Sequence, residues 1–213
     1  NNGTGSSSLA YAENESNIST SNYLTYINSF GEHHLNIIAG QDVQYDLWQP
    51  VSVSGYGGVA DAVQVVRGYA QDKIDLNNSY SDYQSYGILS YYSRLSYDFK
   101  SKYLLAASIR TDGSSRFGTN NKWGTFPSVS LGWLLSEEPF FKKALPDVNI
   151  FKLRASVGSS GSLPSSNYLQ YNLYKVNAGG YEGNSGATSY NGVPAITPDF
   201  VSGAAQPNLS WDH

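Results

Sequence analysis

The glycine-rich and polar motifs that could do chemistry in this sequence fall short of the patterns that catalysis or cofactor binding requires. Residues 55–60 read GYGGVA and match the spacing G-x-G-x-x-A of a dinucleotide-binding turn. That turn needs a buried strand before it and a parallel βαβ unit around it, and the flanking sequence shows neither pattern. We therefore interpret residues 55–60 as a flexible or tightly turned loop.

A second motif resembles an anion cradle or a calcium loop only superficially. It consists of Asp112, Gly113, Ser114, Ser115, Arg116 and Phe117. The motif lacks the Lys-Ser/Thr pair of a phosphate-binding loop and the regularly spaced carboxylates of an EF-hand. We expect a turn at Asp112-Gly113 at the end of a strand, with Arg116 pairing locally.

The remaining polar residues do not form a catalytic or metal-binding pattern. Asp72, Asp75 and Asn77 are spaced loosely, so a solvated loop is favoured over a hard-cation site. His33 and His34 fall at a predicted tight turn, no G-x-S-x-G occurs, and Cys is absent. We predict a protein that is not an enzyme and needs no metal or cofactor.

The composition excludes a nucleic-acid-binding protein and a helical membrane protein. Charged residues make up 14% of the chain, the formal net charge is −4, and no basic run is interleaved with aromatics. No run of 18 apolar residues is present. The 18 tyrosines suit surfaces that are apolar at one end and wet at the other. Membrane β-barrels, β-sandwiches and carbohydrate-binding modules share this bias.

Alternation with a period of two residues is the main structural signal, and it predicts an all-β, antiparallel fold. Strong alternation occurs over residues 89–99, 103–110, 128–135 and 151–157, and weaker strands are expected at about 19–30 and 34–45. Of these six strands, the first pair and the third and fourth are joined by tight turns. Long connections are predicted over residues 46–85, 111–123 and 159–210. Short and long connections that alternate are typical of an outer-membrane barrel.

The two faces of these strands differ in polarity. In a barrel, one face would meet lipid and the other a wet lumen, whereas in a soluble sandwich the charges would simply be solvated. The pattern therefore leaves a secreted β-sandwich adhesin or glycan-binding module as the alternative. We predict that Leu105, Ile109, Leu131, Trp133 and Leu153 face lipid. Arg94, Arg110 and Arg154 are then predicted to face the lumen.

Three segments of the chain carry a specific motif pattern. Residues 102–117 read KYLLAASIRTDGSSRF, residues 123–138 read WGTFPSVSLGWLLSEE, and residues 151–158 read FKLRASVG. These segments closely resemble the SusC/RagA family of TonB-dependent outer-membrane transporters of Bacteroidetes. The family pattern is KYLL-x-A-x-(V/L)-R-x-DGSSRFG, W-G-x-FPSVS-x-GW-x-(I/L)-S-E-E and LK-(L/V)-RAS-(Y/W)-G. Val157 stands where the family usually has an aromatic residue. The tail QPNLSWD resembles the family's NPNL-x-WE, with Asp212 in place of Glu.

The resemblance implies a large plugged barrel of the 22-stranded class, of which this chain would be an internal segment of a single barrel domain without the plug. It implies active import of a bulky nutrient, an oligosaccharide or a peptide. The plug would couple to TonB, and a SusD-like surface lipoprotein would close the outer face. Six strands cannot close around a lumen, because the smallest such barrels use about eight. The remaining barrel strands and membrane lipid are therefore further expected partners.

Ligand contacts in this segment are expected from aromatic side chains in the outside loops, which can stack on apolar ligand faces. The candidates are Trp48, Tyr56, Tyr80, Tyr83, Trp123, Tyr181 and Tyr190. The alternative for each is a place in an interfacial aromatic girdle or in a contact with the lid.

Overall fold

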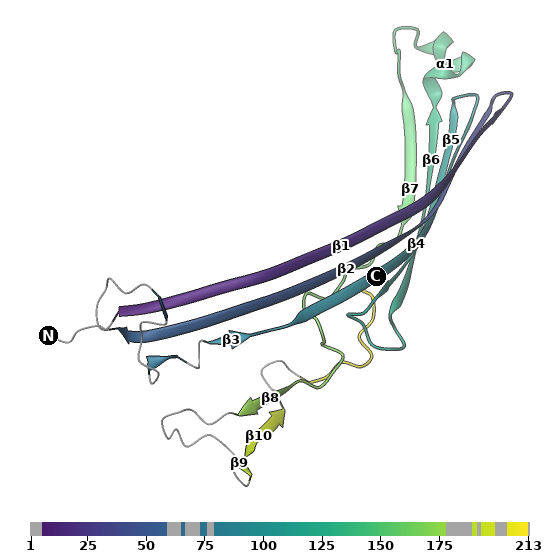
Figure 1. The fold of residues 1–213 in the computed structure, drawn as a ribbon. Coiled ribbons are helices and arrows are strands. Elements are labelled where there is room, and N and C mark those ends of the chain that lie inside the picture. Colours follow the sequence, from purple (N-terminus) through teal and green to yellow (C-terminus); the bar gives the residue numbers. More distant parts are fainter. Residues whose placement is uncertain are drawn as a thin grey trace. The chain divides into compact units, whose positions relative to one another are not determined.

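The computed structural model describes residues 6–58, 65–66, 73–75, 79–177, 189–190, 193–198 and 204–212. Its main sheet is built from β1 (Ser6–Phe30), β2 (His33–Gly58), β4 (Gln84–Phe99), β5 (Tyr103–Ser114), β6 (Trp123–Leu134) and β7 (Lys152–Gly158) (Figure 1). These strands lie in the order β1-β2-β4-β5-β6-β7, and the short β3 (Tyr80–Ser81) pairs with β2. The predicted all-β fold with six principal strands is confirmed.

The smaller elements lie in the connections. Leu135–Glu137 forms a 3-10 helix, η3, and Pro139–Ala144 forms the short helix α1. A separate sheet with the order β8-β10-β9 comprises β8 (Tyr174–Asn177), β9 (Ser189–Tyr190) and β10 (Val193–Pro198). Among the described residues, no helix is both long enough and apolar enough to cross a membrane.

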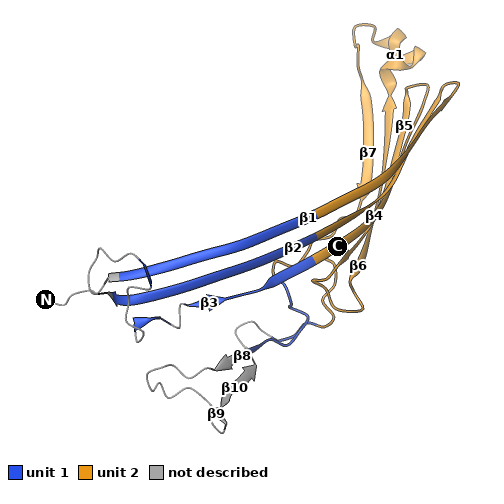
Figure 2. Cartoon of the chain, in the orientation of Figure 1, with its two compact units in different colours: residues 1–18, 45–86, 167–206 blue, residues 19–44, 87–166, 207–213 orange. Residues whose placement is uncertain are grey.

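The chain divides into two compact units (Figure 2). Unit 1 comprises residues 1–18, 45–86 and 167–206, and unit 2 comprises residues 19–44, 87–166 and 207–213. The paired segments of β4, β5, β6 and β7 lie in unit 2, apart from the first three residues of β4. Unit 2 therefore contains the segments in which the sequence showed strong alternation.

Two strands are much longer than their alternation predicted. β1 begins at Ser6 instead of about residue 19, and β2 continues to Gly58, so strand replaces the first part of the loop expected over residues 46–85. In these extensions, polar pairs join the two strands: Asn14 donates to Gln49 at 3.3 Å, and Trp48 Nε1 donates to Glu13 at 3.3 Å. Because polar side chains occupy these paired positions, the extensions carry no continuous apolar stripe. The period-two alternation of apolar and polar residues is therefore absent from this part of the sequence.

The main sheet is open in the part of the chain that the structure describes. β1 and β7 stand at opposite ends of the strand order and do not pair with each other. A single β-layer with two free edges leaves rows of N–H and C=O groups that other strands must satisfy in a membrane. A β-sandwich, the alternative, would need a second sheet packed on this one, whereas the open layer matches a partial barrel wall.

Candidate functional site

The register of β4 to β7 separates the side chains onto two faces of contrasting chemistry. Tyr97, Leu105, Leu131 and Ala155 are paired across the four strands and form one row of what we call the apolar face. Arg94, Ser108, Ser128 and Gly158 form a row on the opposite, polar face. Leu131 is 60% exposed although it is apolar, so nothing in the described part of the chain covers this row. Such a face requires a lipid environment or another sheet.

The predicted partition of residues between the faces agrees with this register. The five residues expected on the lipid side share the apolar face: Leu105, Ile109, Leu131, Trp133 and Leu153. The three arginines expected in the lumen share the polar face: Arg94, Arg110 and Arg154. The period-two interpretation was therefore correct in register, since a slip of one residue would have exchanged the two sets.

A continuous row of rings crosses five strands at the end of the sheet where the tight turns lie. The row runs Phe30, His33, Phe99, Tyr103 and Trp133, and its successive ring centroids are 5.4, 4.6, 6.2 and 6.2 Å apart. All four ring pairs are stacked. Aromatic rows at the level of the lipid headgroups mark the boundary of the apolar band in membrane barrels. We call this row the inner girdle.

A second aromatic pair marks the other boundary of the apolar face. Trp123 stacks on Tyr91 at 6.2 Å, and it pairs with Gly113, where a Cβ atom would lie only 2.8 Å from the indole ring. Ten residues separate Tyr103 from Gly113 on β5, which is about 34 Å along the strand, or roughly 24–28 Å of height at the usual tilt. This height matches the apolar band of about 25 Å in membrane barrels. Trp123 therefore lies on the apolar face, where a place in an aromatic girdle was the alternative to a ligand contact.

The polar face carries a network centred on Arg110. The Arg110 guanidinium donates to Asp112 Oδ1 at 2.7 Å, to Asp42 Oδ2 at 3.2 Å and to Ser90 Oγ at 2.8 Å. Its carbon centre lies 5.7 Å from the Tyr92 ring centroid. These contacts join β2, β4 and β5 across the polar face. They border a cavity of about 410 Å³ that also reaches Leu163 and Trp211.

A larger cavity, of about 570 Å³, lies on the polar face nearer the tight turns. Its lining includes the small residues Ala106, Ser130 and Gly132, the cationic Arg94 and Arg154, and larger apolar residues such as Leu104. Small residues between the two arginines leave room for this recess. This is the chemistry of a lumen wall, where water or another part of the protein fills the space.

The segment Asp112–Phe117 is a structural junction and not a ligand loop. Asp112 and Gly113 lie inside β5, so the turn predicted there is wrong by three residues; the turn falls at Ser115-Arg116. Ser115 and Gly87 exchange hydrogen bonds of 3.0 Å. Arg116 reaches further than the local pairing that we expected, because its Nη1 donates to the carbonyl oxygen of Pro164 at 3.1 Å.

The junction encloses the main buried cluster among the described residues, and the sequence analysis did not anticipate it. Phe117 is 1% exposed, Phe126 9% and Trp211 8%, and Leu163 and Leu209 pack against them. Trp211 lies 4.6 Å from Phe117 and 5.3 Å from Phe126 between ring centroids. The tail that ends at Asp212 is thereby held on the β5–β6 connection. The resemblance of QPNLSWD to a family motif was the one signal that pointed to this segment.

The other aromatic ligand candidates lie in unit 1, and those that the structure describes make different contacts. Trp48 donates a hydrogen bond to Glu13, and the Lys73 ammonium lies 5.6 Å from the centroid of the Tyr56 ring. Tyr80 and Tyr83 are 51% and 55% exposed. Tyr181 lies outside the described residues, and of Tyr190 only the backbone in β9 is described.

The motifs that resembled cofactor or metal sites have ordinary structural roles where they are described. Gly55 forms an antiparallel bridge with Ile74, and Gly57 has φ of +68°, so this segment ends an antiparallel strand without a βαβ unit. Asp75 donates its backbone N–H to Ser54, whereas Asp72 and Asn77 lie outside the described residues. Within the described ranges, no group of three or more His, Asp or Glu side chains gathers to hold a metal.

Comparison with known proteins agrees with this wall-like geometry. The family model described as TonB dependent receptor-like, beta-barrel matches residues 1–209. TonB-dependent receptor P39 of Formosa agariphila is 36% identical over 154 residues, which cover 72% of this chain and 14% of that protein. TonB-dependent receptor SusC of Bacteroides thetaiotaomicron is 34% identical over 169 residues, covering 76% of this chain and 15% of that protein.

A solved structure shares the fold at lower sequence identity. The structure of the RagAB peptide transporter superposes with a TM-score of 0.77 at 24% identity, over 95% of this chain and 21% of the matched chain. This chain therefore spans about a fifth or less of the length of each of these proteins.

Proposed function

The chain belongs to the TonB-dependent receptor β-barrel family, and from that premise we propose that it forms part of the wall and outer rim of an importer for bulky nutrients in the outer membrane of a Bacteroidetes-like bacterium. The family consists of transporters and receptors and not of enzymes. The polar side chains of this segment therefore serve binding and passage, with no covalent step.

The observation that carries this proposal is the division of one open sheet into an apolar and a polar face. The apolar face exposes Leu131 at 60% and Val157 at 71%, and the polar face carries Arg94, Arg110 and Arg154. A β-sandwich adhesin would bury the apolar face against a second sheet, as the core of such a protein requires. An importer wall instead presents that face to lipid and the charged face to a wet passage.

The free edges of β1 and β7 support the proposed partners. Further barrel strands of the same transporter would pair with both edges, and a plug domain would occupy the passage lined by the polar face. Energy would reach the plug through TonB, and a SusD-like lipoprotein would cover the outer end. The cargo we propose is an oligosaccharide or a peptide, with Tyr80 and Tyr83 as exposed stacking surfaces.

Uptake by cells tests the function and the cargo class together. A strain that lacks the full-length transporter is compared with its parent for uptake of labelled oligosaccharides and, in a separate arm, labelled peptides. Loss of uptake in one arm, restored by the full-length gene but not by one whose TonB box is deleted, is the expected result. Unchanged uptake in both arms would overturn the importer proposal.

Two substitutions test the aromatic contacts. Tyr80→Ala and Tyr83→Ala, each in the full-length transporter, are expected to weaken cargo binding, because an apolar face of the bound oligosaccharide or peptide loses the ring on which it stacks. Tyr91→Ala is the matched control, because Tyr91 is also exposed, at 49%, but lies on the apolar face. Equal binding by all three variants would remove Tyr80 and Tyr83 from the ligand site.

A further inference from the structure

We propose that the connection between β6 and β7, residues 135–151, is a membrane-surface element that rests against phospholipid headgroups on the lipid side of the barrel. We call it the inner connection. It contains η3 and α1 and follows the inner girdle directly along the chain. The proposal concerns a site separate from cargo binding, and it depends on the barrel fold but not on what the barrel imports.

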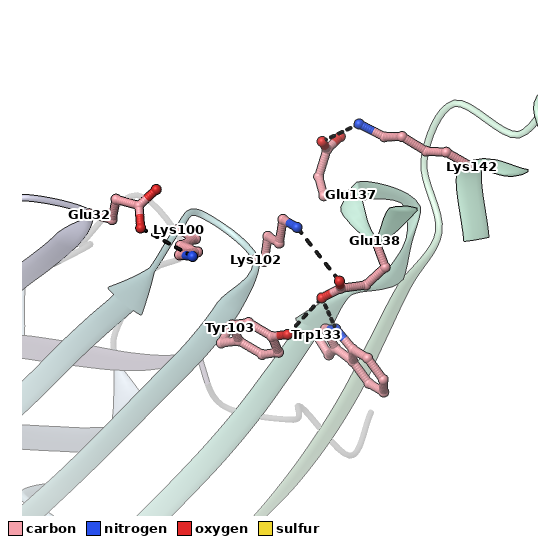
Figure 3. Close-up of polar contacts among 8 residues, drawn as sticks. All are labelled: Glu32, Lys100, Lys102, Tyr103, Trp133, Glu137, Glu138 and Lys142. Carbon is pink, nitrogen blue, oxygen red and sulfur yellow. Dashed lines mark hydrogen bonds and ion pairs between the residues drawn. The ribbon is translucent and has the colours of Figure 1, made fainter. Parts of the chain in front are cut away.

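The first support is the position of the Glu138 carboxylate. Glu138 Oε1 accepts hydrogen bonds from Tyr103 Oη at 2.7 Å and from Trp133 Nε1 at 3.2 Å (Figure 3). Both donors are rings of the inner girdle and lie on the apolar face. Glu138 therefore sits over the lipid side of the sheet, and Lys102 lies 3.6 Å from its other carboxylate oxygen.

A second set of contacts holds α1 at the start of β7. Phe141 of α1 stacks on Phe151 with ring centroids 5.2 Å apart, and Ser136 donates its N–H to the carbonyl oxygen of Phe151 at 3.2 Å. Phe151 directly precedes β7, which begins at Lys152. Together with the hydrogen bonds that Glu138 accepts from two rings of the apolar face, these contacts fix the inner connection at this end of the sheet.

The outward surface of this connection is more apolar than a water-exposed turn requires. Phe140 is 59% exposed, Leu145 50% and Ile150 78%. The two tight turns at the same end of the sheet instead present Glu32 and Lys100, which are ion-paired at 3.3 Å (Figure 3). The inner connection combines this exposed apolar surface with the hydrogen bonds that Glu138 accepts from two rings of the girdle.

The charged side chains of the inner connection are compatible with the headgroup region of a membrane. Lys142 pairs with Glu137 at 2.6 Å (Figure 3). Lys143 is exposed and has no ion-pair partner among the described residues. Apolar side chains beside lysines are typical of segments that lie in the interface of a membrane. Short turns of outer-membrane barrels face the periplasm, so the lipid concerned is the phospholipid of the inner leaflet.

Site-directed fluorescence in the full-length transporter tests this placement. Cysteines replace Phe140 or Ile150 in a background without other cysteines, carry an environment-sensitive label, and are reconstituted in vesicles of phosphatidylethanolamine and phosphatidylglycerol. Quenching by spin-labelled phospholipid is compared with quenching by aqueous iodide. Leu153→Cys is the lipid-facing control, and Ser101→Cys, on the exposed turn between β4 and β5, is the aqueous control.

We expect labels at Phe140 and Ile150 to be quenched by spin-labelled phospholipid several-fold more strongly than the label at Ser101, and to be shielded from iodide. If both behave like Ser101 while Leu153 is quenched by lipid, the inner connection projects into water and the inference is overturned. If Leu153 itself fails to reach lipid, the assignment of the apolar face is wrong, and with it both the inference and the barrel wall. The uptake experiment tests the importer and its cargo independently, so a wrong cargo proposal can be told apart from a wrong placement of the inner connection.

Discussion

The indole N–H of Trp211 donates a hydrogen bond of 3.0 Å to the carbonyl oxygen of Lys122, although 89 residues separate the two. The bond and the ring contacts with Phe117 and Phe126 hold the tail on the β5–β6 connection. The amide of Gly118 reports on this docking, because it donates to Leu209 of the tail at 3.1 Å. The amide of Leu134 donates to the carbonyl oxygen of Lys102 at 2.8 Å, at the opposite end of β6, and serves as an internal control.

Trp211→Ala in the full-length transporter should release residues 206–212 from the β5–β6 connection. Removing a buried ring of this size costs about 3–5 kcal/mol, which corresponds to more frequent local opening by a factor of roughly 10² to 4 × 10³. Trp211→Phe keeps most of the ring but loses the hydrogen bond, and should cost about 1 kcal/mol beyond the lost volume. Hydrogen exchange at Gly118 measures the effect. If the Gly118 amide of the alanine variant exchanges at the parent rate, the tail contributes nothing to the stability of the β5–β6 connection.

Gly118→Ala should have the same consequence for a different reason. A Cβ atom at Gly118 would lie 1.9 Å from the carbonyl oxygen of Pro207, so the tail backbone must move away. Thr119→Ala is the control, since Thr119 is adjacent and exposed. We expect protection at Gly118 to be lost in the first variant and kept in the second. Equal protection in both would mean that the tail can shift without leaving its site.

An arginine on the apolar face should destabilise the folded protein more strongly the closer it lies to the middle of the membrane. Val129 lies close to the middle of the stretch between Trp123 and Trp133, so Val129→Arg should cost about 2–4 kcal/mol of folding free energy in lipid. Leu131 is two residues from the inner girdle, so arginine there should cost less, about 0–1 kcal/mol. Ser130→Arg, on the polar face, is the control. Denaturant titration in vesicles gives the three values, and a larger cost at Ser130 than at Val129 would reverse the assignment of the faces.

The Glu138 junction should depend on pH below the neutral range. Hydrogen bonds from Tyr103 and Trp133, with the Lys102 ammonium nearby, hold the pKa of Glu138 below its usual value of 4.5. Because the folded pKa is the lower one, the stabilisation is present above about pH 4.5 and disappears as the pH falls through the folded pKa. Protease cleavage of the inner connection should therefore increase in acid. Glu138→Gln should remove this pH dependence; an unchanged acid response in that variant would assign it to other groups.

Local alternation was sufficient to predict which side chains of β4 to β7 share a face. A strand places successive side chains on opposite sides, so the pattern of Tyr103, Leu105 and Ile109 against Ser108 and Arg110 fixes the orientation without knowledge of the neighbours. The same argument fails in the outer parts of β1 and β2, where polar pairs such as Asn14 with Gln49 replace the apolar stripe. Those extensions form because a partner backbone satisfies their hydrogen bonds, and that partner is not visible in a local pattern.

The sequence by itself determined the class of fold, the two chemical faces and the positions of the tight turns, because period and turn chemistry act over a few residues. Only the tertiary structure decided that Trp211 packs against Phe117 and Phe126, that Trp123 stacks on Tyr91, and that Phe141 stacks on Phe151. These contacts join segments that are between 10 and 94 positions apart in the chain. Packing at such separations depends on how strands are ordered in the sheet, and no local periodicity carries that order.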